Sequence, residues 1–345
     1  MNSTAATVEQ ADTGMDGKTI LDVENLSIDF MTDEGRITAV QDISFSLKEG
    51  ETLGIVGESG SGKSVTTRAL IRLLASNAIV DDRSRIELTR RDGSRVDICG
   101  LTPGDRTLNQ IRGGEISMIF QEPMASFSPL RTIGTHMVEA LQLHENVSGA
   151  EAKKRSIDLL ERVGIANAPE RFRQYSFQLS GGMRQRAMIA MALVTRPRIL
   201  IADEPTTALD VTIQAQILEL LRDLQRDLGM AMVFITHDLG VIAQIARKVA
   251  VMYLGRVIEE GTTANVIYQP AHPYTRGLLD ALPRLDAGAR RLVPVGGDIP
   301  SPLARPSGCP FHTRCPQIIK GTCEAAVPPV TPISDDHCVS CYLHG

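Results

Sequence analysis

The spacing of apolar residues along the chain alternates between the period of a strand and that of a helix. Short aliphatic and β-branched runs predict three buried strands, namely TLGIVG at 52–57, RILIAD at 198–203 and MAMVFITH at 230–237. Between the last two lies TIQAQILELLRDLQRDLG at 212–229, whose apolar residues recur at helical spacing. Strands that alternate with helices predict a parallel sheet covered on both faces.

The pattern changes several times outside these runs. Strand-like pieces broken by turn residues occupy 19–50, and a helical stretch, VTTRALIRLLAS, spans 65–76. Residues 81–115 are polar and rich in Asp, Arg and Gly, which predicts hairpins and loops. Helical patterns return within about 122–178, and Pro and Gly become frequent from Pro270 onward. We therefore expect one large domain followed by a separate C-terminal segment.

Composition narrows the class of protein. Of 345 residues, 43% are hydrophobic and 22% are charged, which is typical of a soluble globular protein. The net charge of −5 provides no general attraction to nucleic acid or anionic lipid. No apolar run is long enough to span a bilayer, and the polar N-terminus has no signal-peptide features. We expect a disordered tail over 1–18 and a cytoplasmic protein that reaches a membrane only by docking onto proteins that span it.

A glycine-rich motif follows the first predicted buried strand and precedes a helix. Its sequence, GESGSGKS at 57–64, has the spacing of a phosphate-binding P-loop. Glycines let successive backbone N–H groups point at phosphate oxygens, and a helix N-terminus favours the same anion. The predicted nucleotide-binding residues are Gly57, Ser59, Gly60, Ser61, Gly62, Lys63 and Ser64. Lys63 is expected to reach the β- and γ-phosphates, and the Ser64 hydroxyl to help hold Mg²⁺.

Two adjacent acids end the second predicted buried strand. Asp203 fits the role of supporting Mg²⁺, and Glu204 that of positioning or deprotonating an attacking water. A lone acid pair at a strand end is commonly only a polar cap. Its position between a P-loop and the motifs that follow favours the catalytic interpretation.

The segment LSGGMRQR at 179–186 resembles the signature sequence of ATP-binding-cassette (ABC) proteins, which other P-loop ATPases lack. Further landmarks of that family occur in the expected order. Gln121 in IFQEP resembles the Q-loop, ALD at 208–210 the D-loop, and His237 in FITHD the switch histidine. The resemblance covers about residues 19–265.

This resemblance implies an α/β fold with a RecA-like P-loop core, an antiparallel β subdomain and a helical subdomain at about 122–178. Residues 266–345 would form a small cysteine-bearing extension. Two cassettes would pack head to tail, so that Ser180, Gly181 and Gly182 contact ATP bound by the partner cassette. The expected partners are a related sister cassette, two transmembrane permease subunits and an extracytoplasmic substrate-binding protein, with no nucleic acid.

The resemblance also implies roles for single residues. Gln121 would link the Mg²⁺ and water site to the helical subdomain, and His237 would bond the γ-phosphate and the attacking water. Phe30, near the end of the first strand, is the candidate for stacking on adenine. An ordinary strand residue at position 30 is nearly as good an interpretation.

Three other classes of protein compete with the transporter interpretation. Cassettes that act on DNA carry a long coiled coil where residues 122–178 stand here, and those that act on ribosomes usually have two P-loops per chain. A mainly regulatory or redox-sensing protein would be indicated by degenerate ATPase residues. Lys63, Asp203, Glu204 and His237 are all present, which favours a working ATPase.

Five of the six cysteines fall between Cys309 and Cys341, which suggests a metal site rather than scattered core thiols. The segments YQPAHPYTRGLL at 268–279 and GCPFHTRCP at 308–316 resemble the C-terminal region of oligopeptide and dipeptide permease ATPases. That resemblance implies a [4Fe–4S] cluster on four thiolates. By position the ligands would be Cys309, Cys315, Cys323 and Cys341.

Zinc is a rival to the cluster. Cys338 and Cys341 form a C-x₂-C pair, a spacing typical of structural zinc sites, and Cys309 with Cys315 could complete the set. Unligated thiols are a third alternative, and Cys99 is expected to be a small buried hydrophobe. The resemblance implies import of di- or oligopeptides at the inner face of a bacterial cell membrane. Nickel, opines, glutathione and oligosaccharides stay open as cargo.

Overall fold

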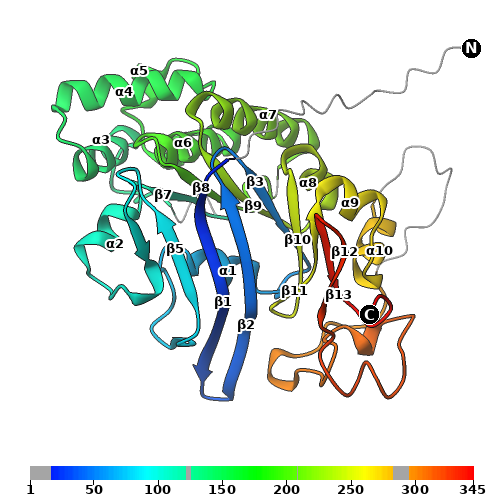
Figure 1. Cartoon of the computed structure of the whole chain (residues 1–345). Helices are drawn as coiled ribbons and strands as arrows, with labels where there is room; N and C mark the ends of the chain where they lie inside the picture. Colours follow the sequence, from blue (N-terminus) through cyan, green and yellow to red (C-terminus); the bar gives the residue numbers. More distant parts are fainter. Residues whose placement is uncertain (1–16, 122–125, 208, 283–294) are drawn as a thin grey trace, which may run out of the picture.

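Two β-sheets and the helices that cover them make up the protein (Figure 1). The computed structural model describes residues 17–345 except 122–125, 208 and 283–294. The tail expected at 1–18 lies outside the described residues for all but its last two positions. No helix among the described residues is both long enough and apolar enough to cross a bilayer.

The larger sheet has eight strands in the order β12-β13-β11-β10-β3-β9-β8-β7. Its parallel part consists of β10 (Lys248–Tyr253), β3 (Thr52–Val56), β9 (Ala231–Thr236), β8 (Ile199–Asp203) and β7 (Ile116–Ile119). All three strands expected from the apolar runs lie here, side by side at its centre. An antiparallel edge follows, made of β11 (Arg256–Thr262), β13 (His337–Ser340) and β12 (Val330–Ser334).

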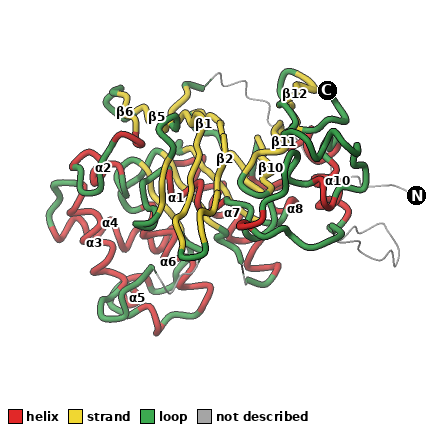
Figure 2. Tube along the Cα trace, turned by 90° about the horizontal axis from the view of Figure 1, so that it is seen from below, coloured by secondary structure: helices red, strands yellow, loops and turns green. Residues whose placement is uncertain are grey.

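The smaller sheet is antiparallel, as the family resemblance implied. Its long strands β1 (Thr19–Thr32) and β2 (Gly35–Lys48) form a hairpin, and β4 (Ala78–Val80), β5 (Arg85–Thr89) and β6 (Arg95–Asp97) complete it. The short helices η1 (Ile98–Gly100) and α2 (Arg106–Ile111) connect it to β7. Seen from below, this sheet lies across α1 (Lys63–Ala69) (Figure 2).

The central strands separate two hydrophobic cores because successive side chains of a strand point to opposite faces. In β8, Leu200 and Ala202 belong to one core, whereas Ile199 and Ile201 belong to the other. The first core is covered by helices and the second by the antiparallel sheet and α1. The parallel sheet expected from the alternation of strands and helices is therefore confirmed, and its central strands are buried throughout.

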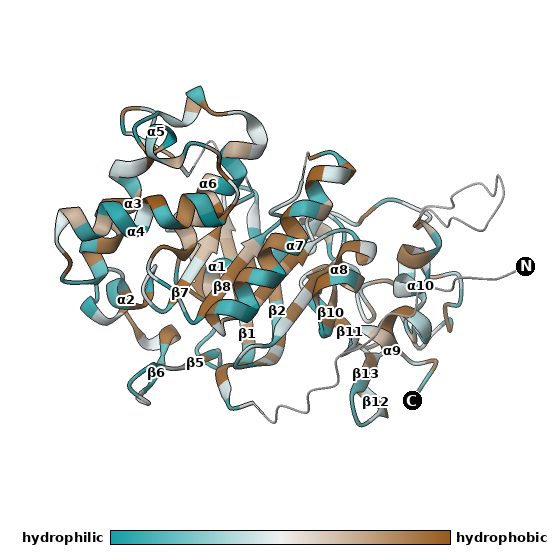
Figure 3. Ribbon diagram, turned by 90° about the horizontal axis from the view of Figure 1, so that it is seen from above, coloured by the Kyte–Doolittle hydropathy of each residue, from teal (hydrophilic) through white to brown (hydrophobic). Residues whose placement is uncertain are grey.

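In the views from the front and above, the helices of the first core form one group at the left and a second group that extends from the centre to the right (Figures 1 and 3). One group is the helical subdomain, with α3 (Ile133–His144), α4 (Gly149–Arg162), α5 (Ala168–Arg171), η2 (Ser176–Gln178) and α6 (Gly181–Leu193). The other contains α7 (Val211–Leu228), α8 (Leu239–Ile245), α9 (Thr263–Tyr268) and α10 (Pro273–Asp280). In α7 apolar residues alternate with polar ones along the helix (Figure 3), and Ile217, Leu218, Leu221 and Leu224 are buried.

The helix after the P-loop is shorter than its apolar pattern predicts. A helix was expected over 65–76, whereas α1 ends at Ala69 and Arg72 takes a left-handed conformation with φ of 53°. The Arg112 guanidinium accounts for the early end. It donates to the carbonyl oxygens of Ile71 (2.8 Å) and Arg72 (2.7 Å), which a continuing helix would have used internally.

The C-terminal segment is integrated with the cassette core. Strand β13 pairs with β11, and Cys309, Phe311 and Cys323 belong to the helix-covered core. The buried Glu259 carboxylate joins the two parts. It accepts hydrogen bonds from the backbone N–H groups of Ala271 (2.7 Å) and His272 (2.9 Å), and lies 2.8 Å from Nε2 of His337. The short helices η3 (Pro302–Ala304) and η4 (His312–Arg314) belong to the same segment.

Candidate nucleotide site

The P-loop occupies the carboxyl end of β3, between Val56 and the first residue of α1. Ligands of open parallel sheets bind at this edge. Two of its glycines are required by the structure. A Cβ at Gly57 would lie 2.2 Å from the carbonyl oxygen of Met252. Gly62 has φ of 96°, and a Cβ there would lie 2.5 Å from the Ala39 carbonyl oxygen.

Lys63 is folded back into the loop. Its ammonium group donates to the carbonyl oxygens of Gly57 (2.7 Å) and Glu58 (2.9 Å), and the residue is 5% exposed. Burial lowers the pKa of Lys63, while the nearby carboxylates of Glu204 and Asp203 act in the opposite direction. The Lys63 ammonium, together with the backbone N–H groups of the P-loop, suits an anion with several oxygens, such as a phosphate chain.

Asp203 and Ser64 meet at the end of β8. The Ser64 hydroxyl donates to Oδ1 of Asp203 at 2.9 Å, and Asp203 is fully buried. Burial raises the pKa of Asp203. Its other oxygen, Oδ2, is buried and lacks a hydrogen-bond partner within the part of the chain that the structure describes. A buried carboxylate oxygen beside a hydroxyl is the kind of hard donor pair that Mg²⁺ prefers, so these residues fit the predicted ion.

The Glu204 carboxylate contacts Thr207 in its own loop and residues of two other loops, Gln121 and His237. Its Oε2 accepts from Gln121 Nε2 (3.3 Å) and Thr207 Oγ1 (2.8 Å), and lies 3.5 Å from Nδ1 of His237. The His237 side chain is 60% exposed, whereas that of Glu204 is 13% exposed. Glu204 itself has a left-handed backbone with φ of 48°, and its N–H donates to the Ile235 carbonyl oxygen at 3.0 Å. The predicted catalytic residues therefore do meet in space.

The signature residues lie apart from this cluster. Ser180 caps α6 by accepting from the Met183 N–H, and both Ser180 and Gly181 are exposed. No hydrogen bond joins Ser180, Gly181 or Gly182 to the P-loop of the same chain, both segments being among the described residues. The position is compatible with the prediction that these residues serve the partner's nucleotide.

Two further residues, Gln185 and Thr207, support the site through contacts that the sequence did not predict. The buried amide of Gln185 in α6 donates to the Pro205 carbonyl oxygen, which ties the signature helix to the loop after Glu204. Thr207 orients the Glu204 carboxylate. Gln185 lies within the signature match at 179–186, but its contact with Pro205 could not be read from the sequence, and Thr207 had no signal of its own.

Phe30 lies on β1, where it pairs with Ile37 of β2, and it packs half-buried against the second core. The same β2 strand reaches the P-loop, since the Ala39 carbonyl oxygen abuts Gly62. The stacking of Phe30 on adenine stays a prediction.

The structure brings four cysteines into one region and excludes a fifth. Burial, followed by the nearby thiols of Cys323, Cys341 and Cys315, raises the pKa of Cys309 to about 11. Cys338 is not among these neighbours, because it faces away from Cys341, whose side of β13 carries the buried His337 and Val339. Nevertheless, no group of three or more His, Cys, Asp or Glu in the described ranges is arranged to hold a metal ion. The described residues thus give no support to the predicted cluster or to its zinc alternative.

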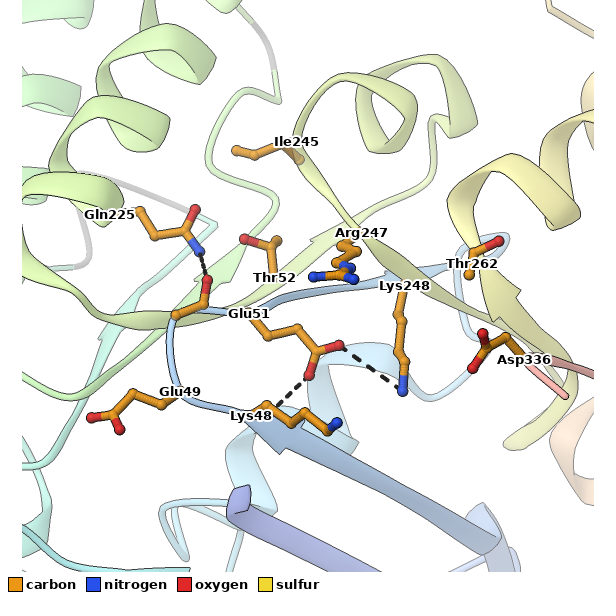
Figure 4. A pocket seen from close by; sticks show the side chains of 11 residues that line it. Lys48, Glu49, Glu51, Thr52, Gln225, Ile245, Arg247, Lys248, Thr262 and Asp336 are labelled. Atoms are coloured by element: carbon orange, nitrogen blue, oxygen red, sulfur yellow. Dashed lines mark hydrogen bonds and ion pairs between the residues drawn. The ribbon is translucent and has the colours of Figure 1, made fainter. Parts of the chain in front are cut away.

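A cavity of about 370 Å³ lies away from the nucleotide site, at the amino end of the parallel strands (Figure 4). Glu51 is at its centre, accepting from the Lys48 N–H at 2.9 Å and lying 4.0 Å from the Lys248 ammonium. Gln225 closes one side by donating to the Gly50 carbonyl oxygen at 3.0 Å. This cavity contains none of the predicted site residues.

Comparison with known families agrees with this geometry. Residues 40–207 match the family model for the ABC transporter, and residues 258–323 match that of the oligopeptide/dipeptide transporter C-terminal region. The chain is 48% identical over 324 residues to the dipeptide transport ATP-binding protein DppD of Bacillus subtilis, covering 94% of each. It is 47% identical to the oligopeptide transport ATP-binding protein OppD of Escherichia coli, covering 94% of this chain and 93% of that protein.

The chain belongs to the ABC transporter ATP-binding protein family. Among solved structures, the dimeric ABC transporter cassette MJ0796 matches with a TM-score of 0.61 and 28% identity, over 71% of this chain and 99% of that one. The same cassette in a post-hydrolysis state bound to ADP and Pi matches with a TM-score of 0.60. The predicted cassette fold and ATPase activity of this ABC protein are thereby confirmed. The domain boundary at 265 stays a prediction.

Proposed function

We propose that this ABC subunit hydrolyses ATP to power the import of di- or oligopeptides. The observation that carries the proposal is the Glu204 cluster, in which an acid, an amide and an imidazole from three separate loops converge beside the P-loop. Peptide cargo is supported by 47–48% identity to peptide-transport subunits over 94% of the chain, and by the matching C-terminal region.

Each residue has a definite part in this mechanism. Lys63 and the P-loop amides bind the phosphates, while Ser64, Asp203 and Gln121 would hold Mg²⁺, which would neutralise phosphate charge when bound. Glu204 accepts a proton from the attacking water, and His237 positions that water and the γ-phosphate. Glu204 is held at the right place because Thr207 and Gln121 both donate to one of its oxygens.

The exposed signature suggests the assembly. Ser180 and Gly181 present a helix N-terminus to solvent, where added donors suit the γ-phosphate held by a second cassette. We propose a sister subunit as that partner, two permease subunits that contact the helical subdomain, and an extracytoplasmic binding protein. The chain would then act on the cytoplasmic face of the cell membrane as a peripheral subunit.

The test is uptake by a deletion strain that is offered labelled dipeptide, pentapeptide and nickel, with rescue by the wild-type chain or by Lys63→Ala. Loss of peptide uptake that only the wild type restores is the expected result. Loss of nickel uptake alone, or of none of the three, would overturn the peptide assignment and leave the ATPase standing. Purified Lys63→Ala should bind ATP about tenfold or more weakly, since it lacks a charge-assisted phosphate contact; an unchanged dissociation constant would contradict the role of Lys63.

We also propose that Cys309, Cys315, Cys323 and Cys341 hold a [4Fe–4S] cluster. Cys323 lies near enough to Cys309, Cys315 and Cys341 to raise the pKa of those three thiols, and ligation would release their protons. Cys338 faces away from Cys341, which disfavours the C-x₂-C pair that a zinc ion would use.

Anaerobic purification followed by iron, sulfide and zinc analysis tests the cluster. Cys309→Ser should lose the iron, and Cys338→Ser, its matched control, should retain it. Stoichiometric zinc without iron, or equal loss from both variants, would rule out this ligand set.

A further inference from the structure

The P-loop receives support from the C-terminal segment, at Glu58. This residue follows Gly57, and its carbonyl oxygen is one of the two that hold the Lys63 ammonium. The Glu58 N–H does not face the nucleotide region. It donates to the hydroxyl of Tyr274 in α10 at 2.9 Å. The orientation of this part of the P-loop is therefore set from two sides, by Lys63 within the cassette and by Tyr274 from the C-terminal segment.

The Glu58 carboxylate is held by a second residue of that segment. Arg314 donates to it in bidentate fashion, from Nη1 to Oε2 at 2.6 Å and from Nη2 to Oε1 at 3.1 Å. The Arg314 side chain is 3% exposed and that of Glu58 is 25% exposed. Planar two-point pairing of this kind fixes direction as well as charge.

Arg314 is itself fully coordinated. Its remaining N–H groups donate to the Tyr253 hydroxyl (3.3 Å), the Val295 carbonyl oxygen (3.0 Å) and the Gly296 carbonyl oxygen (2.9 Å). Its guanidinium carbon lies 5.7 Å from the centre of the Tyr253 ring and 5.9 Å from that of Phe311. Such a site leaves Arg314 no freedom to turn away from Glu58, so the position of the C-terminal segment is transmitted to the P-loop.

The ion pair between Glu58 and Arg314 changes the charge of the phosphate-binding loop. Glu58 is an acid within a loop that must receive a polyanion, and an unpaired carboxylate there would repel the phosphates and compete for Lys63. Arg314 neutralises the carboxylate and holds it against the C-terminal segment.

We propose that Arg314 is a positioning residue for ATP binding, which acts through Glu58 to hold the P-loop in its phosphate-binding conformation. The proposal rests on the ATP-hydrolysing role of the chain and is independent of the cargo. It assigns the C-terminal segment a part in nucleotide binding, although that segment lies outside the cassette motifs.

The test is the affinity of the purified full-length chain for a fluorescent ATP analogue, measured with Arg314→Met in two backgrounds. In the wild-type background the substitution should weaken binding about tenfold, with little change in turnover at saturating ATP in the assembled transporter. In the Glu58→Gln background the same substitution should change affinity less than about twofold, because the carboxylate on which Arg314 acts is gone. Arg276→Met is the matched control, since Arg276 is exposed in the same segment and donates only to the Pro270 carbonyl oxygen among the contacts described.

An equal loss of affinity in both backgrounds would overturn the proposal, as would an affinity equal to that of Arg276→Met. If Arg314→Met fails to fold, Arg314→Lys replaces it, since lysine keeps the charge and loses the bidentate pairing. It should give an intermediate loss of affinity that again vanishes in the Glu58→Gln background. These titrations contain no transport substrate, so they are unaffected if the peptide assignment fails.

Discussion

Two carboxylates are buried in the same eight-stranded sheet, Asp203 at the end of β8 and Glu259 within β11. Both Glu259 oxygens have partners, because two backbone N–H groups and His337 surround them. Asp203 has one partner, Ser64, and an oxygen with none among the described residues. A buried polar atom without a partner costs stability, so it is retained where a ligand uses it. Glu259 therefore joins parts of the fold, and Asp203 is available to a cation.

The largest effect is expected at the nucleotide site, on ATP turnover. Glu204→Gln should lower ATP turnover of the assembled transporter by about a hundredfold or more, because the amide cannot accept the proton of the attacking water. ATP binding should persist, and the paired cassettes should favour their closed state. Steady-state hydrolysis and nucleotide affinity measure the two properties, and unchanged hydrolysis would show that Glu204 is not the base.

The next largest effect is expected at Glu259, on the stability of the fold. Glu259→Ala should destabilise the chain by about 3 kcal/mol or more, since it leaves three buried donors without an acceptor. The melting temperature should fall on the order of 10 °C. Nucleotide affinity of the folded fraction, measured well below the melting point, should change little. A melting temperature equal to that of the wild type would remove the distinction between the two carboxylates.

Acid should weaken the same structural junction through His272. Burial lowers its pKa to about 3, and its Nδ1 accepts from the Tyr274 N–H, which requires the unprotonated ring. The folded pKa lies below the unfolded value of 6.5, so this contribution is complete above pH 6.5 and is lost as the pH falls from 6.5 toward 3. The loss should be about 1.4 kcal/mol per pH unit in that window.

Urea unfolding at several pH values measures this loss, with His272→Asn as the control because asparagine can cap α10 and does not titrate. The slope of unfolding free energy between pH 6.5 and 5 should be smaller in the variant. Identical slopes would mean that other groups dominate the acid response.

The smallest effect on stability is expected at Asp203. Burial raises the folded pKa of this acid, so its ionised form costs stability above that pKa, and the cost disappears as the pH falls below 3.8. Asp203→Asn should therefore leave the melting temperature at neutral pH unchanged or raise it by a few degrees, roughly, in magnesium-free buffer. Magnesium-dependent ATP turnover should be lost. A fall in melting temperature like that of Glu259→Ala would show that Asp203 also serves the fold.

Local sequence was sufficient for much of the fold because some patterns need no distant partner. Apolar runs predicted β3, β8 and β9, and helical spacing predicted α7. The end of α1 could not be predicted, because it depends on Arg112, a residue about forty positions away whose guanidinium binds the carbonyl oxygens of Ile71 and Arg72 just after the helix. Likewise, the C-x₂-C spacing of Cys338 and Cys341 suggested a zinc pair, whereas the strand between them turns the two side chains apart.

By itself, the sequence determined the cassette family, the P-loop and the acids that follow β8, since glycine spacing and charged residues at strand ends are local signals. Tertiary structure decided which groups meet. It placed Gln121, Thr207 and His237 around Glu204, and it brought Arg314 to Glu58 across most of the chain. The physical reason is that hydrogen bonds and charge pairs form between atoms a few ångströms apart, and the fold alone sets those distances.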